Sequence, residues 1–153
     1  TRLARRWFYL DELERTVGDR LRVITAEARS YLGVTSVGHR RYDVVVSDCF
    51  GGAEPVSELA TVEALRLVRG SLNPGGIYVA NIVSANRGSD VTFLRDCVAA
   101  ALEVFAHAWV VPCGDAEFGG EENYLLVASD GDYAFAEAVP FDTDFLGTVL
   151  HDK

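Results

Sequence analysis

The amino-acid sequence predicts an α/β protein with one mostly parallel sheet that ends in an antiparallel edge hairpin. Three observations lead to this prediction. Short apolar runs alternate with helical patterns through the middle of the 153-residue chain. The runs at 42–48 and 76–83 are almost continuously apolar, as is typical of strands buried on both faces. The last two runs are joined by a nine-residue polar loop that contains no helical pattern.

The N-terminal part is predicted to hold two helices with a short strand between them. Residues 21–25 alternate apolar and polar side chains and predict that strand. A short helix from residue 28 ends at Gly33, and a loop follows to residue 41. The first helix, over 2–17, is predicted from apolar residues that recur every three or four positions: Leu3, Trp7, Leu10, Leu13 and Val17.

The central part is predicted to form a β-α-β-α unit. A loop over 49–56 follows the strand at 42–48, and Ser57 can cap a helix over 57–72. The turn "NPGG" at 73–76 leads into the next strand. The remaining predicted elements are a helix over 90–105 capped by Ser89, strands over 107–113 and 123–129, and a tail with a short helix and an amphipathic turn around Phe141, Phe145, Leu146 and Val149.

This order of elements narrows the fold class. Alternating strands and helices predict a mostly parallel sheet covered on both faces. A parallel sheet that ends in an antiparallel hairpin is the arrangement of the C-terminal portion of a class I methyltransferase-like, or Rossmann-like, domain. We therefore expect one such domain over residues 1–153.

Composition excludes several classes of function. A net charge of −9 argues against a nucleic-acid groove, and it suits either a cationic substrate or an ordinary acidic surface. No apolar stretch approaches the roughly 20 residues of a membrane span, and the basic N-terminal segment lacks the apolar core of a signal peptide. Widely spaced cysteines and histidines indicate neither disulfides nor a metal site, so we expect a cytoplasmic protein without a metal: Cys49, Cys97, Cys113, His39, His107 and His151.

An acid stands at the end of the most apolar run. Val44–Val46 leads within two residues to Asp48, and Gly51 and Gly52 follow. Open α/β sheets place their ligands at the carboxyl ends of strands, next to such loops. Asp48 is therefore a candidate catalytic residue, and the alternative is that its carboxylate caps the turn that leaves the strand.

Two segments resemble the spermidine synthase, or polyamine aminopropyltransferase, family. They read "RLRVITAEARSYL" at 20–32 and "YDVVVSDCFGGAEPVSELATVEALRLVRGSLNPGGIYVANIV" at 42–83, within a resemblance over roughly residues 3–130. The resemblance implies transfer of an aminopropyl or methyl group to a small amine. The implied donor is decarboxylated S-adenosylmethionine or S-adenosylmethionine.

The same resemblance implies roles for three residues. Glu27 would bind the amino group of adenine, and the main chain of Ala28 would approach the same ring. Asp48 would take a proton from the attacking amine, which must lose its ammonium proton to become a nucleophile. On the residues alone, Glu27 could instead be an acid favoured by the positive end of a helix dipole.

The sequence also departs from the family pattern. The family follows its catalytic aspartate with a second acid, whereas this chain has Cys49–Gly52, with Glu54 three residues beyond the expected position. The family's glycine-rich loop and ribose-binding acid are absent, so we expect a domain that lacks its first two strands. The alternative is a non-catalytic homologue that serves as a binding or oligomerisation module. Because missing strands expose a sheet edge, we expect a homo-oligomer.

Overall fold

The structure is a computed structural model that describes residues 2–38, 41–51, 54–85, 92–114, 121–139 and 146–153. Its helices are α1 (Arg2–Trp7), α2 (Leu10–Val17), α3 (Ala28–Val37), α4 (Val62–Ser71) and α5 (Thr92–Leu102), with 3-10 turns η1 (Gly18–Arg20) and η2 (Ser57–Leu59). Its strands are β1 (Tyr42–Ser47), β2 (Phe50–Gly51), β3 (Glu54–Pro55), β4 (Leu72–Ala85), β5 (His107–Pro112) and β6 (Glu121–Ser129). The predicted α/β class is confirmed.

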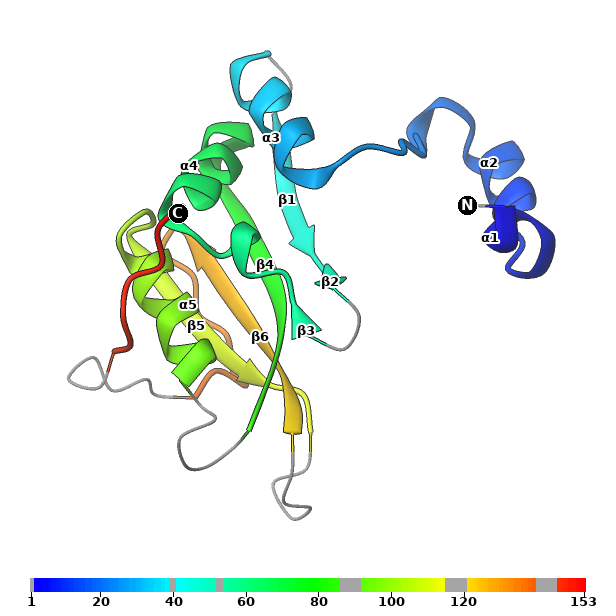
Figure 1. Cartoon of the computed structure of the whole chain (residues 1–153). Coiled ribbons are helices and arrows are strands. Elements are labelled where there is room, and N and C mark those ends of the chain that lie inside the picture. Colours follow the sequence, from blue (N-terminus) through cyan, green and yellow to red (C-terminus); the bar gives the residue numbers. More distant parts are fainter. Residues whose placement is uncertain (1, 39–40, 52–53, 86–91, 115–120, 140–145) are drawn as a thin grey trace.

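The main sheet has four strands in the order β1-β4-β6-β5 (Figure 1). β1 and β4 are adjacent and parallel, as their β-α-β spacing predicts. β6 runs antiparallel to both β4 and β5, which confirms the edge hairpin. The sheet is therefore mixed: β1, β4 and β5 point the same way, and β6 alone is reversed.

The hydrophobic core lies where α4 and α5 pack against the sheet (Figure 1). Leu65 from α4, Val98 from α5 and Leu126 from β6 are almost completely buried there. Tyr78 of β4 stacks on Phe105, with ring centroids 6.3 Å apart. These contacts pack the helical layer against β4 and β6, and β1 joins this unit through its parallel pairing with β4.

The N-terminal part differs from its prediction in three ways. The helix over 2–17 is interrupted before Leu10, because Tyr9 adopts a left-handed backbone conformation with φ 55°. No strand forms over 21–25: this segment pairs with no other strand of the described chain, and alternation alone does not supply a partner. α3 continues past Gly33 to Val37, because the Thr35 hydroxyl is buried 3.2 Å from that of Ser71. Tertiary contacts here outweigh the poor helix propensity of glycine.

The later elements also differ in detail. Thr61, not Ser57, caps α4, since its hydroxyl accepts a hydrogen bond from the Ala64 amide at 3.2 Å. The predicted turn at 73–76 lies inside β4 as an irregularity in its register with β1. The predicted loop over 49–56 includes the β2–β3 ladder. Ser89, Phe141 and Phe145 lie outside the described residues, and the described parts of the tail contain no helix.

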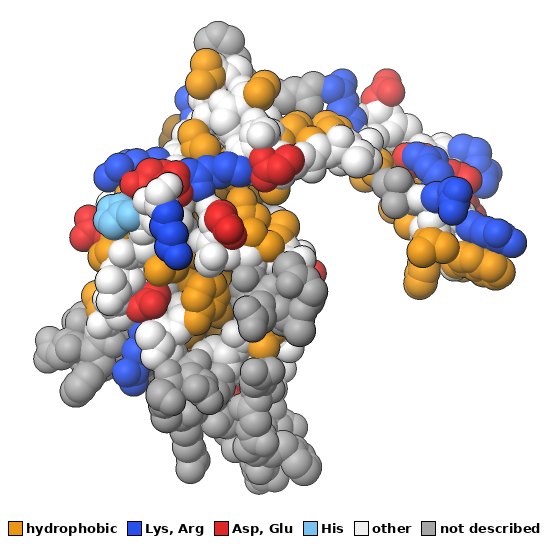
Figure 2. Space-filling model, in the orientation of Figure 1, with side chains coloured by type: hydrophobic (Ala, Val, Ile, Leu, Met, Phe, Trp, Pro, Cys, Tyr) orange, Lys and Arg blue, Asp and Glu red, His pale blue; other side chains and the backbone are white. Residues whose placement is uncertain are grey.

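α1 and α2 form an arm that stands apart from the sheet (Figure 1). Neither helix buries a residue, and Trp7 and Phe8 are 63% and 76% exposed. Figure 2 shows apolar side chains gathered along one side of this arm, next to arginines. Among the described residues, no helix is long and apolar enough to cross a membrane.

Candidate active site

The candidate site begins where β1 ends. The parallel register pairs Ser47 with Ala80, so Asp48 comes to lie beside Asn81 of β4. The Asn81 Nδ2 group donates a hydrogen bond to Asp48 Oδ1 at 3.0 Å. Asp48 is exposed, so its carboxylate is held by one neighbour and open to solvent. The predicted acid therefore lies at the carboxyl end of a strand, beside a partner that the sequence reasoning did not identify.

The other end of the Asn81 amide is unusual. Asn81 Oδ1 is buried and has no hydrogen-bond partner within the described structure. The amide is oriented by Asp48, because only its NH₂ group can donate to a carboxylate. A buried polar atom without a partner costs roughly 1–3 kcal/mol of folding free energy. The one sequence signal for this residue is an amide inside the apolar run "IYVANIV".

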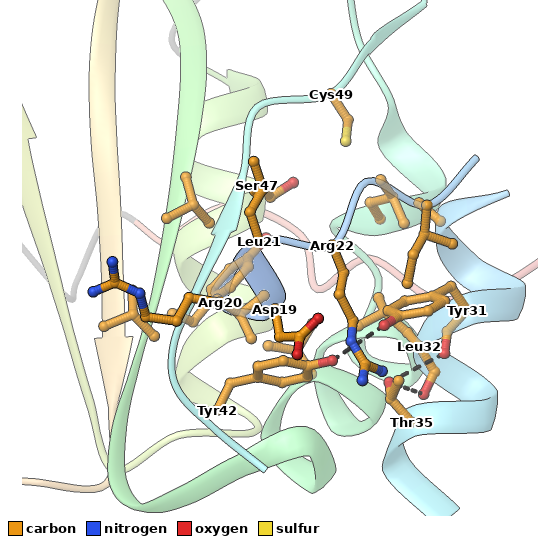
Figure 3. A pocket seen from close by; sticks show the side chains of 18 residues that line it. Asp19, Arg20, Leu21, Arg22, Tyr31, Leu32, Thr35, Tyr42, Ser47 and Cys49 are labelled. Atoms are coloured by element: carbon orange, nitrogen blue, oxygen red, sulfur yellow. Dashed lines mark hydrogen bonds between the residues drawn. The ribbon is translucent and has the colours of Figure 1, made fainter. Parts of the chain in front are cut away.

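A cavity of about 580 Å³ lies beside this carboxylate, between the segment 19–24, α3 and β1 (Figure 3). This volume falls within the range of small-molecule sites. Valines of β1 supply much of its wall, and Tyr31 and Tyr42 contribute hydroxyl groups 3.2 Å apart. Ser47 and Cys49, the two neighbours of Asp48, line one end of the cavity. Asp48 itself is not a lining residue, so the cavity and the carboxylate are adjacent rather than merged.

Ser47 also connects the cavity to the core. Its side chain lies on the same side of the sheet as the buried hydroxyl of Tyr78 and interacts with it. Burial raises the pKa of Tyr78 to about 12, and the interaction with Ser47 opposes that rise. Tyr78 therefore stays protonated at neutral pH and serves as a core aromatic that fixes the end of β1.

Glu27 and Ala28 lie at the start of α3. Glu27 is the helix cap, and its two carboxylate oxygens accept hydrogen bonds from the amides of Arg29 and Ser30, each at 2.7 Å. The hydrogen bonds from Ser30, followed by that from Arg29, lower the pKa of Glu27. Ala28 lines the cavity. The structure thus brings Ala28 and the neighbours of Asp48 to one cavity, while Glu27 is an exposed cap at its border.

The described residues contain no group of three or more His, Cys, Asp or Glu that could hold a metal ion. The polar groups that the described residues bring to this site are a carboxylate, an amide, hydroxyls and a thiol. A carboxylate can hold an ammonium group by a charge-assisted hydrogen bond and accept its proton.

Comparison with known proteins gives two curated relatives and many similar structures, although no family model matches. A probable polyamine aminopropyl transferase of Bifidobacterium longum is 32% identical over 79 residues, which is 50% of this chain and 17% of the relative. A polyamine aminopropyltransferase of Aeropyrum pernix is 30% identical over 115 residues, 72% of this chain and 34% of the relative. The chain is spermidine synthase-like.

The fold of this spermidine synthase-like chain agrees with that relationship. A probable spermidine synthase from Corynebacterium glutamicum superimposes with a TM-score of 0.74 at 23% identity. The match covers 99% of this chain and 60% of that structure. The sheet is thus Rossmann-like, as expected, and the matched region spans about a third or less of the curated relatives' lengths.

Proposed function

We propose that this spermidine synthase-like chain carries the amine-activating part of an aminopropyltransferase site. The observation that supports the proposal is the Asp48 carboxylate, which lies at the end of β1, is oriented by Asn81 at 3.0 Å, and borders a cavity of about 580 Å³. The curated relatives are named as polyamine aminopropyltransferases, which gives the chemistry this carboxylate would serve.

In the proposed reaction, Asp48 holds a cationic amine by a charge-assisted hydrogen bond and accepts its proton. The freed nitrogen lone pair attacks the carbon bound to the donor's sulfonium sulfur. The new C–N bond forms as the C–S bond breaks, and the departing electron pair neutralises the sulfur to a thioether. The donor is decarboxylated S-adenosylmethionine for aminopropyl transfer, or S-adenosylmethionine for methyl transfer.

The donor's adenine would lie at the start of α3, against Ala28 and within reach of Glu27. Each Glu27 oxygen already accepts one amide hydrogen bond, and a carboxylate oxygen has room for a second. The chain lacks the family's glycine-rich loop and ribose acid, so we propose that it forms the second part of the catalytic domain, without the first two strands. Residues outside this sequence would complete the donor site.

We also propose a cytoplasmic location and self-association for this chain. Cys49, Cys97 and Cys113 are free thiols, which fits a reducing cytoplasmic location. The exposed apolar side of the arm and the outer edge of β1, which pairs with no described strand, support self-association. The same surfaces, together with the altered loop after Asp48, support the second candidate function: a non-catalytic binding or oligomerisation module.

The test is turnover by the native gene product that carries this sequence. With decarboxylated S-adenosylmethionine and a diamine, we expect release of methylthioadenosine; with S-adenosylmethionine, methyl transfer would release S-adenosylhomocysteine. Asp48→Asn should reduce kcat by about 10²–10⁴ while the melting temperature changes little. Asp43→Asn is the matched control, because Asp43 is the second residue of the same strand and accepts a hydrogen bond from Asn73 at 2.7 Å.

Two results would contradict the proposal. Full activity in Asp48→Asn, combined with a lower melting temperature, would make Asp48 a structural turn residue. Absence of either product in the wild type, with the fold intact, would favour the non-catalytic module.

A further inference from the structure

The C-terminal tail lies across the beginning of α4 (Figure 1). The Val62 amide donates to the Leu150 carbonyl oxygen at 2.8 Å, and the Asp152 amide donates to Glu63 Oε2 at 3.0 Å. His151 Nδ1 lies 3.0 Å from the second oxygen of Glu63. The tail is thus fixed to α4 by three contacts within three consecutive residues.

Asp152 then connects α4 to α3. One of its carboxylate oxygens accepts a hydrogen bond from the Thr61 hydroxyl at 2.7 Å, and the other lies 2.5 Å from the Arg29 guanidinium. Arg29 also donates to the Glu58 carbonyl oxygen at 2.7 Å and to the Thr61 hydroxyl at 3.1 Å. One arginine of α3 is therefore held by acceptors from η2, the α4 cap and the tail.

The beginning of α3 has few other attachments. The segment 21–27 before it pairs with no strand in the described chain, and Thr35 is the helix's one fully buried residue. Ala28 is only half-buried. The first turn is otherwise attached through Tyr31, whose hydroxyl lies 3.2 Å from that of Tyr42. Among the described residues, the Arg29 contacts are those that join this turn to η2, α4 and the tail.

We propose that Leu150–Asp152 form a clip that positions the first turn of α3, with Arg29 and Asp152 as positioning residues. This inference rests on the proposed function, because that turn carries the Glu27–Ala28 edge expected to receive the adenine of the donor. The clip would hold this edge in place for the purine end of a nucleoside ligand. It would act on donor binding rather than on the proton transfer at Asp48.

The test compares Asp152→Asn with Asp132→Asn, a change to an exposed carboxylate in another part of the tail. The Arg29, Ser30 and Tyr31 amides all bind Glu27 and report on the first turn of α3. By NMR hydrogen exchange, Asp152→Asn should speed exchange of these amides about two- to fivefold, as expected for loss of a partly exposed ion pair. Asp132→Asn should leave them unchanged, and Arg29→Lys should behave like Asp152→Asn, because a lysine cannot serve three acceptors in a fixed fork.

Ligand binding supplies the functional readout. In the native gene product that carries this sequence, Asp152→Asn should weaken methylthioadenosine binding by a similar factor and raise the KM for the donor, while kcat stays at the wild-type value. Equal exchange in Asp152→Asn and Asp132→Asn would overturn the clip. Faster exchange with unchanged methylthioadenosine affinity would overturn its positioning role. If the wild type binds no methylthioadenosine, the proposed donor site fails, and the exchange comparison alone still decides whether the clip exists.

Discussion

Replacing Asn81 by leucine should stabilise the fold and weaken catalysis at the same time. Leucine is close to asparagine in shape and fills the same space without polar atoms. The change removes Asn81 Oδ1, the buried oxygen without a partner, and relieves a cost of roughly 1–3 kcal/mol. It also removes the hydrogen bond to Asp48, but that carboxylate is exposed, so the loss is screened by solvent and small.

The sum of these two effects should make the Asn81→Leu variant more stable than the wild type. A net gain of about 1 kcal/mol would raise the melting temperature of a chain of this size by about 2–4 °C. Turnover should fall, because the Asp48 carboxylate loses the amide that orients it. We would measure both on one sample, by thermal unfolding followed by circular dichroism and by release of methylthioadenosine from the native gene product.

Asn73→Leu is the matched control. Asn73 lies on the same strand, and its Nδ2 group donates to Asp43 Oδ1 at 2.7 Å, the same contact at the opposite end of β1. Its oxygen is not among the buried atoms without a partner. Asn73→Leu should therefore give no stabilisation and no loss of turnover. A lower melting temperature in Asn81→Leu than in Asn73→Leu would refute the reasoning, since it would mean that Asn81 Oδ1 has a stabilising partner in solution.

Two further predictions concern pH and self-association. The hydrogen bond with His151, followed by that from the Asp152 amide, lowers the pKa of Glu63 from 4.5 to about 2. Hydrogen bonds from Thr61 and Arg29 lower the pKa of Asp152, while burial and the charge of Glu63 act in the opposite direction. Because both pKa values fall on folding, the tail contacts should be complete above about pH 4.5 and lost as the pH falls toward 2, which exchange of the Val62 amide will measure. The exposed apolar arm predicts a dimer or larger assembly on the order of 10 µM, and a clean monomer in sedimentation velocity would contradict this.

Local patterns were sufficient to predict the sheet. The runs at 42–48 and 76–83 are apolar enough to be strands, and their β-α-β spacing left one favoured arrangement, which β1 and β4 adopt. Burial on both faces was wrong for β1, because it is an edge strand whose Val44 and Val46 are 50% and 67% exposed. The same kind of pattern failed at 21–25, where alternation was present but no partner strand was available. A strand depends on its neighbour for backbone hydrogen bonds, so its own residues do not determine whether it forms.

The residues of the candidate site could be found from the sequence only in part, for a similar reason. Asp48 could be recognised because an acid at the end of an apolar run is a local signal. Asn81 could not be recognised in the same way, because only the strand register places it beside Asp48, which lies 33 residues earlier in the sequence. The clip could not be predicted from the sequence either, because Arg29 and Asp152 are 123 residues apart and no local pattern connects them. Contacts between distant segments require the fold before they can be seen.

The pair of Asp48 and Asn81 also bears on the choice between a transferase and a non-catalytic module. A module that needs only its fold gains nothing from an amide oxygen buried without a partner, because an apolar residue would fill the same position at lower free energy. Unsatisfied buried groups are rare in native structures and call for an explanation. Departures from the rules of packing are expected at functional sites, where stability is given up for chemistry. Here the departure lies next to an exposed carboxylate at the end of a strand, beside a cavity of about 580 Å³. The arrangement therefore favours the proposed role of Asp48 as a base over a module that needs only its fold.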